Sequence, residues 1–356
     1  MNKIVIIGNG FDIAHELPTK YEQFMNYILD SIVQKVSLSS SSYRYETIGQ
    51  KCRRDSNYIH KLTSEQKEDP WIGAKLKRTA GKYQFETNPH SKSKSIYFNS
   101  LFKKNSRSGY WSDLEFHYFE ILKNHRNNLN DVITINEEFE HLKKLLNHYL
   151  KTEIEDNFGS TGKYKVDKSN PIYQMLISGH NDYDFQKHYF ITFNYTTKIL
   201  HQYVEWLRKL KKVENVPINP IFIHGDVINP QNPIIFGYGD DNSEEYKELQ
   251  NTKQKELLKN FKTFQYLRSN RYRQVLGLLE ENDEIYVQII GHSCDICDKA
   301  LLRTIFEHQN VKHIEATYYE NENRYFENLF NISRIFNDNT LMREKLIPLE
   351  ETFKII

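Results

Sequence analysis

The sequence predicts an α/β fold, a Rossmann-like parallel sheet with a large, mainly helical insertion after its first strand–helix unit. Two observations predict this class. Strand-like and helix-like segments alternate through the second half of the chain, as in parallel sheets that are covered by helices on both faces. The first predicted strand, residues 3–8, is a continuous aliphatic run that ends at a glycine, which is typical of a buried parallel strand before a tight turn.

A helix is predicted after this turn. Thr19 and Glu22 have the spacing of a capping box, in which each residue accepts a hydrogen bond from a free amide of the first helical turn. Apolar residues then recur at intervals of three and four as far as Val36. The pattern indicates one apolar face that packs on a sheet.

The composition changes after this helix. Residues 37–108 are polar and rich in serine and lysine, with little periodicity, whereas residues 111–158 regain a helical pattern. We therefore predict a nucleotide-binding core formed by residues 1–36 and 185–356, and an insertion subdomain formed by residues 37–184.

Five strand-like segments follow in the second half of the chain: 189–193, 221–223, 234–236, 285–290 and 311–318. Four amphipathic segments lie between or after them: 199–210, 266–279, 301–306 and 325–336. We expect the first strand to join these strands in one sheet across the insertion.

Composition excludes several classes of function. The 356 residues contain no run of about 18 apolar residues, so no membrane partner is expected. Lys and Arg total 48 and Asp and Glu total 47, so the net charge gives no strong signal for nucleic acid. A first strand that begins directly after Met1, together with three cysteines, predicts a cytoplasmic protein without disulfides.

Cys294 and Cys297 form a C-x-x-C pair. A structural zinc site needs four ligands, and the second half of such a site is missing here. We interpret the pair as two small, half-buried side chains on a helix, and no bound metal is expected.

Polar residues gather just past the carboxyl ends of the predicted strands. They fall in five loops: Gly8-Asn9-Gly10-Phe11-Asp12, Asn194-Tyr195-Thr196, His224-Gly225-Asp226, Gly237-Tyr238-Gly239-Asp240 and Gly291-His292-Ser293. In an open parallel sheet this edge is where ligands bind. Because all five loops carry polar residues at this edge, we predict that they form one shared site.

Each of these residues also has a purely structural interpretation. Asn194 and Ser293 are suited to cap the helices that follow them. His224 is suited to the rim of the core, and Asp12 and Asp226 to bonding nearby turn amides.

Several motifs, in this order, resemble the AbiH family of bacterial abortive-infection proteins: Gly8 to His15 with Leu17, Thr19, Tyr21 and Phe24, then Trp111 to Glu115, Phe193 to Thr196, Ile223 to Gly225 and Gly291 to Ser293. One departure is Glu16, where the family pattern leads us to expect glycine. The resemblance implies an effector of phage defence. It also implies a phage-derived trigger protein and a homo-oligomer as expected partners.

More distantly, the order of loops resembles sirtuin-like domains, which bind nicotinamide adenine dinucleotide (NAD+). This resemblance implies that Asn194 and His224 are the catalytic residues. It implies that the remaining loop residues bind NAD+: Gly8, Asn9, Gly10, Phe11, Asp12, Thr196, Asp226, Asp240, Gly291, His292 and Ser293. Three cysteines cannot supply the four-cysteine zinc module of sirtuin deacylases, so the resemblance implies hydrolysis of NAD+ at the nicotinamide N-glycosidic bond.

Three alternatives remain open at this point. The shared site at the carboxyl edge of the sheet could bind a nucleotide as a signal without hydrolysing it. A metal-dependent phosphoesterase or nuclease would use four residues suited to divalent ions: Asp12, His224, Asp226 and His292. A dehydrogenase is disfavoured, because Ile13 stands where the dinucleotide fingerprint requires a third glycine. The sequence does not choose which carboxylates assist: Asp12, Asp113, Glu115 or Asp226.

Overall fold

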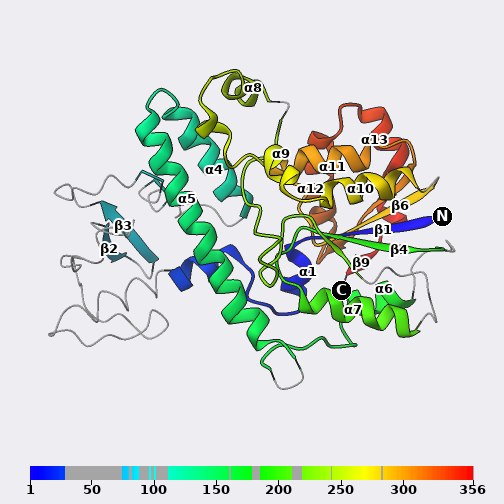
Figure 1. Cartoon of the computed structure of the whole chain (residues 1–356). Coiled ribbons are helices and arrows are strands. Elements are labelled where there is room, and N and C mark those ends of the chain that lie inside the picture. Colours follow the sequence, from blue (N-terminus) through cyan, green and yellow to red (C-terminus); the bar gives the residue numbers. More distant parts are fainter. Residues whose placement is uncertain are drawn as a thin grey trace. The chain divides into compact units, whose positions relative to one another are not determined.

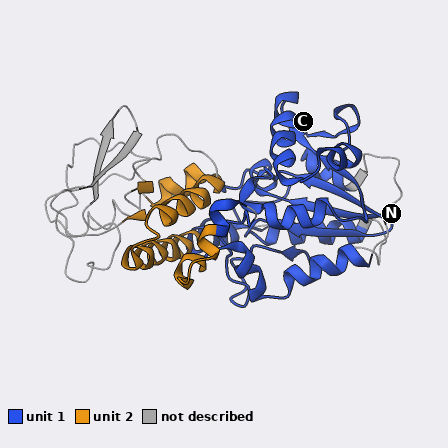
Figure 2. Cartoon of the chain, turned by 90° about the horizontal axis from the view of Figure 1, so that it is seen from above, with its two compact units in different colours: residues 1–19, 147–247, 260–356 blue, residues 20–146, 248–259 orange. Residues whose placement is uncertain are grey.

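The structure, a computed structural model, describes residues 1–28, 74–79, 82–87, 96–97, 100–101, 111–159, 162–178, 185–210, 219–241, 243–281 and 284–355. The chain divides into two compact units, coloured separately in Figure 2. The first unit comprises residues 1–19, 147–247 and 260–356, and the second comprises residues 20–146 and 248–259.

The first unit contains a five-stranded parallel sheet in the order β5-β4-β1-β6-β7. Its strands are β1 (Asn2–Ile7), β4 (His188–Thr192), β5 (Ile221–Phe222), β6 (Ile285–Ile290) and β7 (Val311–Ala316). In order along the chain the strands lie 3-2-1-4-5, which is the order of Rossmann folds. The predicted Rossmann-like α/β class is therefore confirmed, and β1 joins the later strands as expected.

Helices cover both faces of this sheet, with α6 and α7 on one face and α10, α11 and α12 on the other (Figure 1). The longer helices of this unit are α6 (Pro171–Ser178), α7 (Lys198–Leu210), α10 (Arg271–Glu280), α11 (Lys299–Phe306), α12 (Glu322–Ile335) and α13 (Asn339–Lys345). Shorter helices lie in the connections: α1 (Asn9–Ala14), η2 (Leu150–Ile154), η3 (Glu155–Asn157), α9 (Lys262–Gln265), η5 (Tyr266–Arg268), η6 (Ile296–Asp298) and η7 (Leu349–Glu351).

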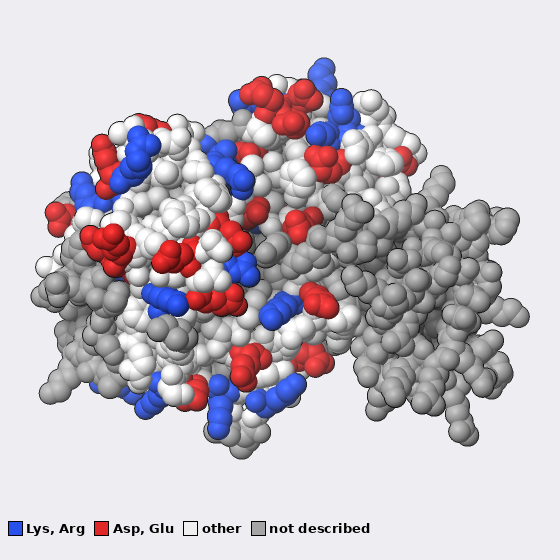
Figure 3. All heavy atoms as spheres, turned by 180° about the vertical axis from the view of Figure 1, so that it is seen from behind, with Lys and Arg blue, Asp and Glu red and all other residues white. Residues whose placement is uncertain are grey.

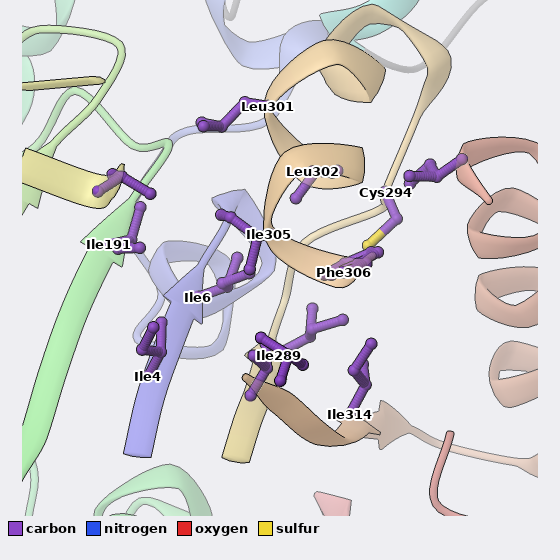
Figure 4. Close-up of a cluster of buried hydrophobic side chains, with 14 of the residues drawn as sticks. Ile4, Ile6, Ile191, Ile289, Cys294, Leu301, Leu302, Ile305, Phe306 and Ile314 are labelled. Carbon is purple, nitrogen blue, oxygen red and sulfur yellow. The ribbon is translucent and has the colours of Figure 1, made fainter. Parts of the chain in front are cut away.

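The main core lies between the sheet and α11. Every residue of β6 is buried, as expected for a parallel strand with helices on both sides. Ile4 and Ile6 of β1 point toward Ile305 of α11, and all three side chains are fully buried (Figure 4). Burying an aliphatic side chain of this size stabilises the fold by about 1.5–3 kcal/mol.

The second unit contains α4 (Trp111–Asn124), most of α5 (Leu129–Tyr149), η4 (Lys255–Leu258) and an antiparallel hairpin, β2 (Ala74–Thr79) and β3 (Lys82–Thr87). The helix α8 (Glu244–Gln250) spans the boundary between the units. The ring of Tyr118 stacks on Phe139 with 3.9 Å between the ring centroids. The helical pattern predicted between residues 111 and 158 is confirmed, but the hairpin is a feature that the sequence analysis missed.

The predicted helix after the first turn is described only in part. Residues 21–28 are helical, and the remainder up to Val36 lies outside the described residues, as does most of the polar stretch 37–108.

Two predicted strands and one predicted helix differ from the structure. Residues 234–236 form no strand, because Pro233 has no N–H to donate and Ile235 donates instead to the carbonyl oxygen of His224, at 2.7 Å. The strand predicted at 311–318 is divided into β7 and β8 (Tyr318–Tyr319), and β8 pairs with β9 (Lys354–Ile355). The helix predicted from residue 266 begins at Arg271, after the short turn η5.

Basic and acidic side chains alternate over the face of the molecule shown in Figure 3, in agreement with a net charge of +1. Among the described residues, no helix combines the length and the apolar character that crossing a membrane requires.

The turn after β1 packs directly on the loop after β6. A Cβ atom at Gly8 would overlap the Cα atom of His292 and would lie 2.7 Å from the carbonyl oxygen of Gly291. Gly291 itself has a φ of +65°, which disfavours a side chain. The Gly10 amide donates to the Gly291 carbonyl at 2.7 Å. Glycine is therefore required at this turn for contact between two loops.

We expect Gly8→Ala to lower the free energy of unfolding by about 1–3 kcal/mol, the usual cost of overpacking. Urea unfolding followed by circular dichroism measures this change. Gly277→Ala is the matched control, because a Cβ atom there has no neighbour within 4 Å and alanine favours the interior of α10 by up to about 1 kcal/mol. Equal unfolding midpoints for the two variants would show that the loop contact does not require glycine.

Candidate functional site

The loops after β1 and β4 bring Asn194, Asp12 and Thr196 together. The Asn194 amide nitrogen Nδ2 donates to the carbonyl oxygen of Gly8 at 3.0 Å and to Asp12 Oδ1 at 2.9 Å. Thr196 Oγ1 donates to Asp12 Oδ2 at 2.6 Å. Asp12 therefore bonds side chains of another loop, and not the turn amides that its structural interpretation required.

Asp12 lies in a setting that favours its protonated form. Burial raises the pKa of Asp12 from its usual 3.8 to about 7, and the hydrogen bonds from Thr196 and Asn194 offset this only in part. The nearby carboxyl group of Glu155 raises this pKa further, because two like charges disfavour ionisation. Asp12 is therefore close to half protonated at neutral pH.

Glu155 caps the helix that follows Asn194. Its Oε1 accepts from the backbone amides of Thr197 and Lys198 at the start of α7, and the side chain is almost fully buried. Glu155, which is distant from α7 in the sequence, therefore caps this helix. The interpretation of Asn194 as the cap is wrong.

A second cluster centres on the carboxylate of Asp298 in η6. Its Oδ1 accepts from the Lys262 ammonium at 2.7 Å and lies 3.2 Å from His224 Nε2. Its Oδ2 lies 3.5 Å from His292 Nε2. Both histidines and Lys262 are buried, and the Asp298 side chain is 13% exposed. Three donors from three different segments thus converge on one carboxylate.

Charge in this cluster is set by the Asp298–Lys262 pair. Burial alone would raise the pKa of Asp298, but the Lys262 ammonium and the His224 imidazole hold it well below its usual value. Burial, and then the charge of Lys262, lowers the pKa of His224 to about 4, although Asp298 acts in the opposite sense. His224 is therefore neutral at physiological pH.

The hydrogen bonds assign the proton of each imidazole. His292 Nδ1 accepts from the Cys294 amide at 2.9 Å, so its proton is on Nε2, which faces Asp298. Among the described residues, the hydrogen-bonding neighbours of His224 both lie at Nε2: Asp298 Oδ1 at 3.2 Å and Tyr266 Oη at 3.1 Å. A neutral His224 that donates from Nε2 to Asp298 carries its lone pair on Nδ1.

Aromatic rings on both sides of Asn194 connect the two clusters. The Phe193 ring lies 4.9 Å from the His224 ring and 4.2 Å from the His292 ring, between centroids. Tyr195 stacks with His224 at 6.3 Å. Asn194, His224 and His292 therefore meet at one edge of the sheet, as the sequence analysis predicted.

Lys262 and Asp298 were missed as site residues. Neither residue belongs to the five loops from which the shared site was predicted. Lys262 is placed by its own amide, which donates to the Tyr238 carbonyl at 2.9 Å. No pattern in the sequence brings residue 262 next to residue 298.

Four other predicted residues serve mainly to hold the loops in place. Asn9 Nδ2 donates to the Thr19 carbonyl at 3.0 Å, and the buried Phe11 ring packs on Tyr203 with 5.2 Å between centroids. Asp226 accepts from the amides of residues 228 and 229 and from Asn232, which is the turn role considered for it. Asp240 lies 3.8 Å from Lys299 Nζ.

Ser293 does not cap the following helix, as the structural interpretation proposed. The N-cap of η6 is Asp295, whose side chain accepts from the Cys297 amide at 3.3 Å. The exposed Ser293 offers its carbonyl oxygen to Asn331 Nδ2 at 2.8 Å.

Three amides of the first turn already have partners within the protein. The Gly8 amide donates to Ile290, that of Gly10 to Gly291 and that of Phe11 to Gly8, at 3.0, 2.7 and 2.9 Å. These N–H groups are therefore engaged in loop packing, and they do not support the expectation that this turn holds the phosphates of a dinucleotide.

Cys294 and Cys297 are fully buried, more deeply than the half-buried pair that we predicted. The sulfur of Cys294 lies in the apolar core beside Phe306 (Figure 4), and burial raises the pKa of its thiol. Cys297 is in η6, whereas Cys294 precedes it with a φ of +51°. Within the described ranges, no three His, Cys, Asp or Glu side chains are arranged to hold a metal ion.

These features define an α/β protein of the Rossmann class with a buried polar site at the carboxyl edge of its sheet. The model of the family described as "Bacteriophage abortive infection AbiH" matches residues 4–320. The chain therefore belongs to the AbiH family, as its motifs predicted, and this membership supports a role in abortive infection by bacteriophage. Comparisons with curated proteins and with solved structures find no match.

The raised pKa of Asp12 predicts that stability falls as the pH rises. Between about pH 4 and pH 7 the folded protein retains a proton that the unfolded chain has lost, so the free energy of unfolding decreases by up to roughly 1.4 kcal/mol per pH unit and levels off above the folded pKa of about 7.

Asp12→Asn removes this titration and keeps the size of the side chain. We expect the variant to lose this component of the pH dependence, measured by urea unfolding at a series of pH values. Identical pH profiles for the two proteins would contradict the burial of a protonatable Asp12.

Proposed function

We propose that this AbiH protein acts in abortive infection by binding NAD+ and hydrolysing its nicotinamide N-glycosidic bond. One observation carries the proposal: His224, whose Nε2 lies 3.2 Å from Asp298 Oδ1, is at the same sheet edge as Asn194, whose Nδ2 is held by Gly8 and Asp12. The distant resemblance to sirtuin-like domains, in which an asparagine and a histidine flank the nicotinamide ribose, supports the same assignment.

The reaction suits a neutral imidazole. When the bond between ribose C1′ and nicotinamide breaks, its electron pair moves to the ring nitrogen and the cationic pyridinium becomes neutral nicotinamide. This leaving group needs no proton, so no general acid is required. Water bonds to C1′ after an oxocarbenium-like state, and its proton passes to His224 Nδ1 and then to solvent, which leaves ADP-ribose as the second product.

Asn194 is suited to orient the ribose or the water. Its Nδ2 is held by Gly8 and Asp12, so its orientation is fixed before a ligand binds. The carbonyl oxygen Oδ1 is then the atom that accepts from a ribose hydroxyl or from water. Since the Gly8, Gly10 and Phe11 amides are engaged, we assign the diphosphate to the loop formed by residues 291–293.

A second candidate is a sensor that binds the nucleotide without hydrolysing it. The low pKa of His224, about 4, favours this role because a weak base contributes less to proton transfer at neutral pH. A sensor would bind NAD+ in calorimetry and release it intact.

Incubation of the purified protein with NAD+, with and without lysate of phage-infected cells as a source of trigger, tests the proposal by release of nicotinamide. We expect Asn194→Ala and His224→Ala each to lower kcat by about 100-fold or more. His308→Ala is the matched control, because His308 precedes β7 at the opposite end of that strand and should retain activity.

No release under either condition would contradict the hydrolase, and intact NAD+ recovered from a tight complex would identify the sensor. Release that survives both site substitutions would show that another site performs the reaction.

A further inference from the structure

The geometry points to Asp298, held by the Lys262 ammonium, as the positioning residue that makes Nδ1 of His224 the basic atom of this site. Neither residue carries a recognised motif, and the inference rests on the proposed function for its kinetic consequence only. The state of the imidazole that it assigns is a property of the protein without ligand.

The first step concerns the direction of the Asp298 carboxylate. Lys262 Nζ lies 2.7 Å from Oδ1 and its side chain is 1% exposed, so one buried ion pair fixes the carboxylate. Burial by itself raises the pKa of Asp298, and the Lys262 ammonium makes the largest contribution that lowers it. Lys262 keeps Asp298 ionised and therefore purely an acceptor.

The second step follows from this acceptor role. Because an ionised Asp298 cannot donate, both His224 and His292 must present N–H groups to it, and both do so through Nε2. In His292 the other nitrogen accepts from the Cys294 amide. In His224 no hydrogen bond from the described residues is formed at Nδ1, so Nδ1 is the atom to which we assign the role of proton acceptor.

The third step concerns charge. The Lys262 ammonium disfavours the imidazolium form of His224, whereas the Asp298 carboxylate favours it. Lys262 and Asp298 thus shift the pKa of the His224 imidazole in opposite directions. Removal of the Lys262 charge should therefore raise the pKa of His224, and removal of the Asp298 charge should lower it.

Nitrogen-15 NMR of the full-length, labelled protein tests the assignment through two-bond correlations of the imidazole rings. We expect both His224 and His292 as Nε2–H tautomers. In Asp298→Asn the oxygen stays at the position of Oδ1, which faces both Lys262 and His224, and the amide faces His292. Because the negative charge that favours a proton on His224 Nε2 is lost, the fraction of the Nδ1–H tautomer of His224 should rise. Lys262→Met should raise the pKa of His224 by about one unit or more toward 6.5.

The matched control is Asp295→Asn. Asp295 lies three residues from Asp298 and caps η6, and asparagine caps helices equally well, so the tautomer of His224 should not change. If Asp298→Asn does not fold, the double variant Asp298→Asn, Lys262→Met removes both charges together, which buried pairs often tolerate. It should show the same loss of the Nε2–H preference.

Measurements of kcat and KM distinguish a failure of this inference from a failure of the proposed function. If the wild type hydrolyses NAD+, Asp298→Asn should lower kcat by about 100-fold or more with little change in KM, and Asp295→Asn should not. Wild-type activity together with an unchanged tautomer and unchanged kcat in Asp298→Asn would overturn the inference while leaving the function standing. Absence of activity, with the tautomers as assigned, would overturn the function alone.

Discussion

The arrangement of the site depends on contact between the backbones of two loops, the turn after β1 and the loop after β6. The Gly10 amide donates to the Gly291 carbonyl, and a Cβ atom at Gly8 would overlap His292. This contact brings the Gly8 carbonyl to Asn194 and sets the backbone of His292. The turn after the central strand β1 thus contributes to the site mainly through the close backbone contact that its glycines allow. In many Rossmann folds amides of the corresponding turn bind a diphosphate, whereas here the Gly10 amide donates to the Gly291 carbonyl.

Two carboxyl groups at this edge are held in opposite states. Asp12 is buried among hydrogen-bond donors that carry no charge, so its pKa rises to about 7. Asp298 is also buried, but Lys262 keeps it ionised. An ammonium group thus makes the difference between a carboxyl that exchanges a proton near neutrality and one that does not. Asp12 bonds the side chain of Asn194, and Asp298 lies beside His224.

The sequence predicted the class of fold because continuous aliphatic strands and amphipathic helices are local patterns. It also predicted that Asn194, His224 and His292 meet, because parallel strands place their carboxyl ends at one edge. It did not predict Lys262, which reaches Asp298 from the start of the short helix α9. The strand predicted at residues 234–236 does not form, because Pro233 has no N–H group to donate to a neighbouring strand. The capping of α7 by Glu155 was not predicted either, because a helix cap normally comes from a residue adjacent to the helix in sequence.

The strand order has a consequence for how the protein is made. In the sheet, Ile7 lies between Thr192 and Ile290, so β1 has both of its neighbouring strands only after residue 290 has been synthesised. Contacts between segments so distant in sequence form slowly, because the intervening chain must first lose entropy. The site needs residues from Gly8 to Asp298, so a nascent or truncated chain cannot assemble it.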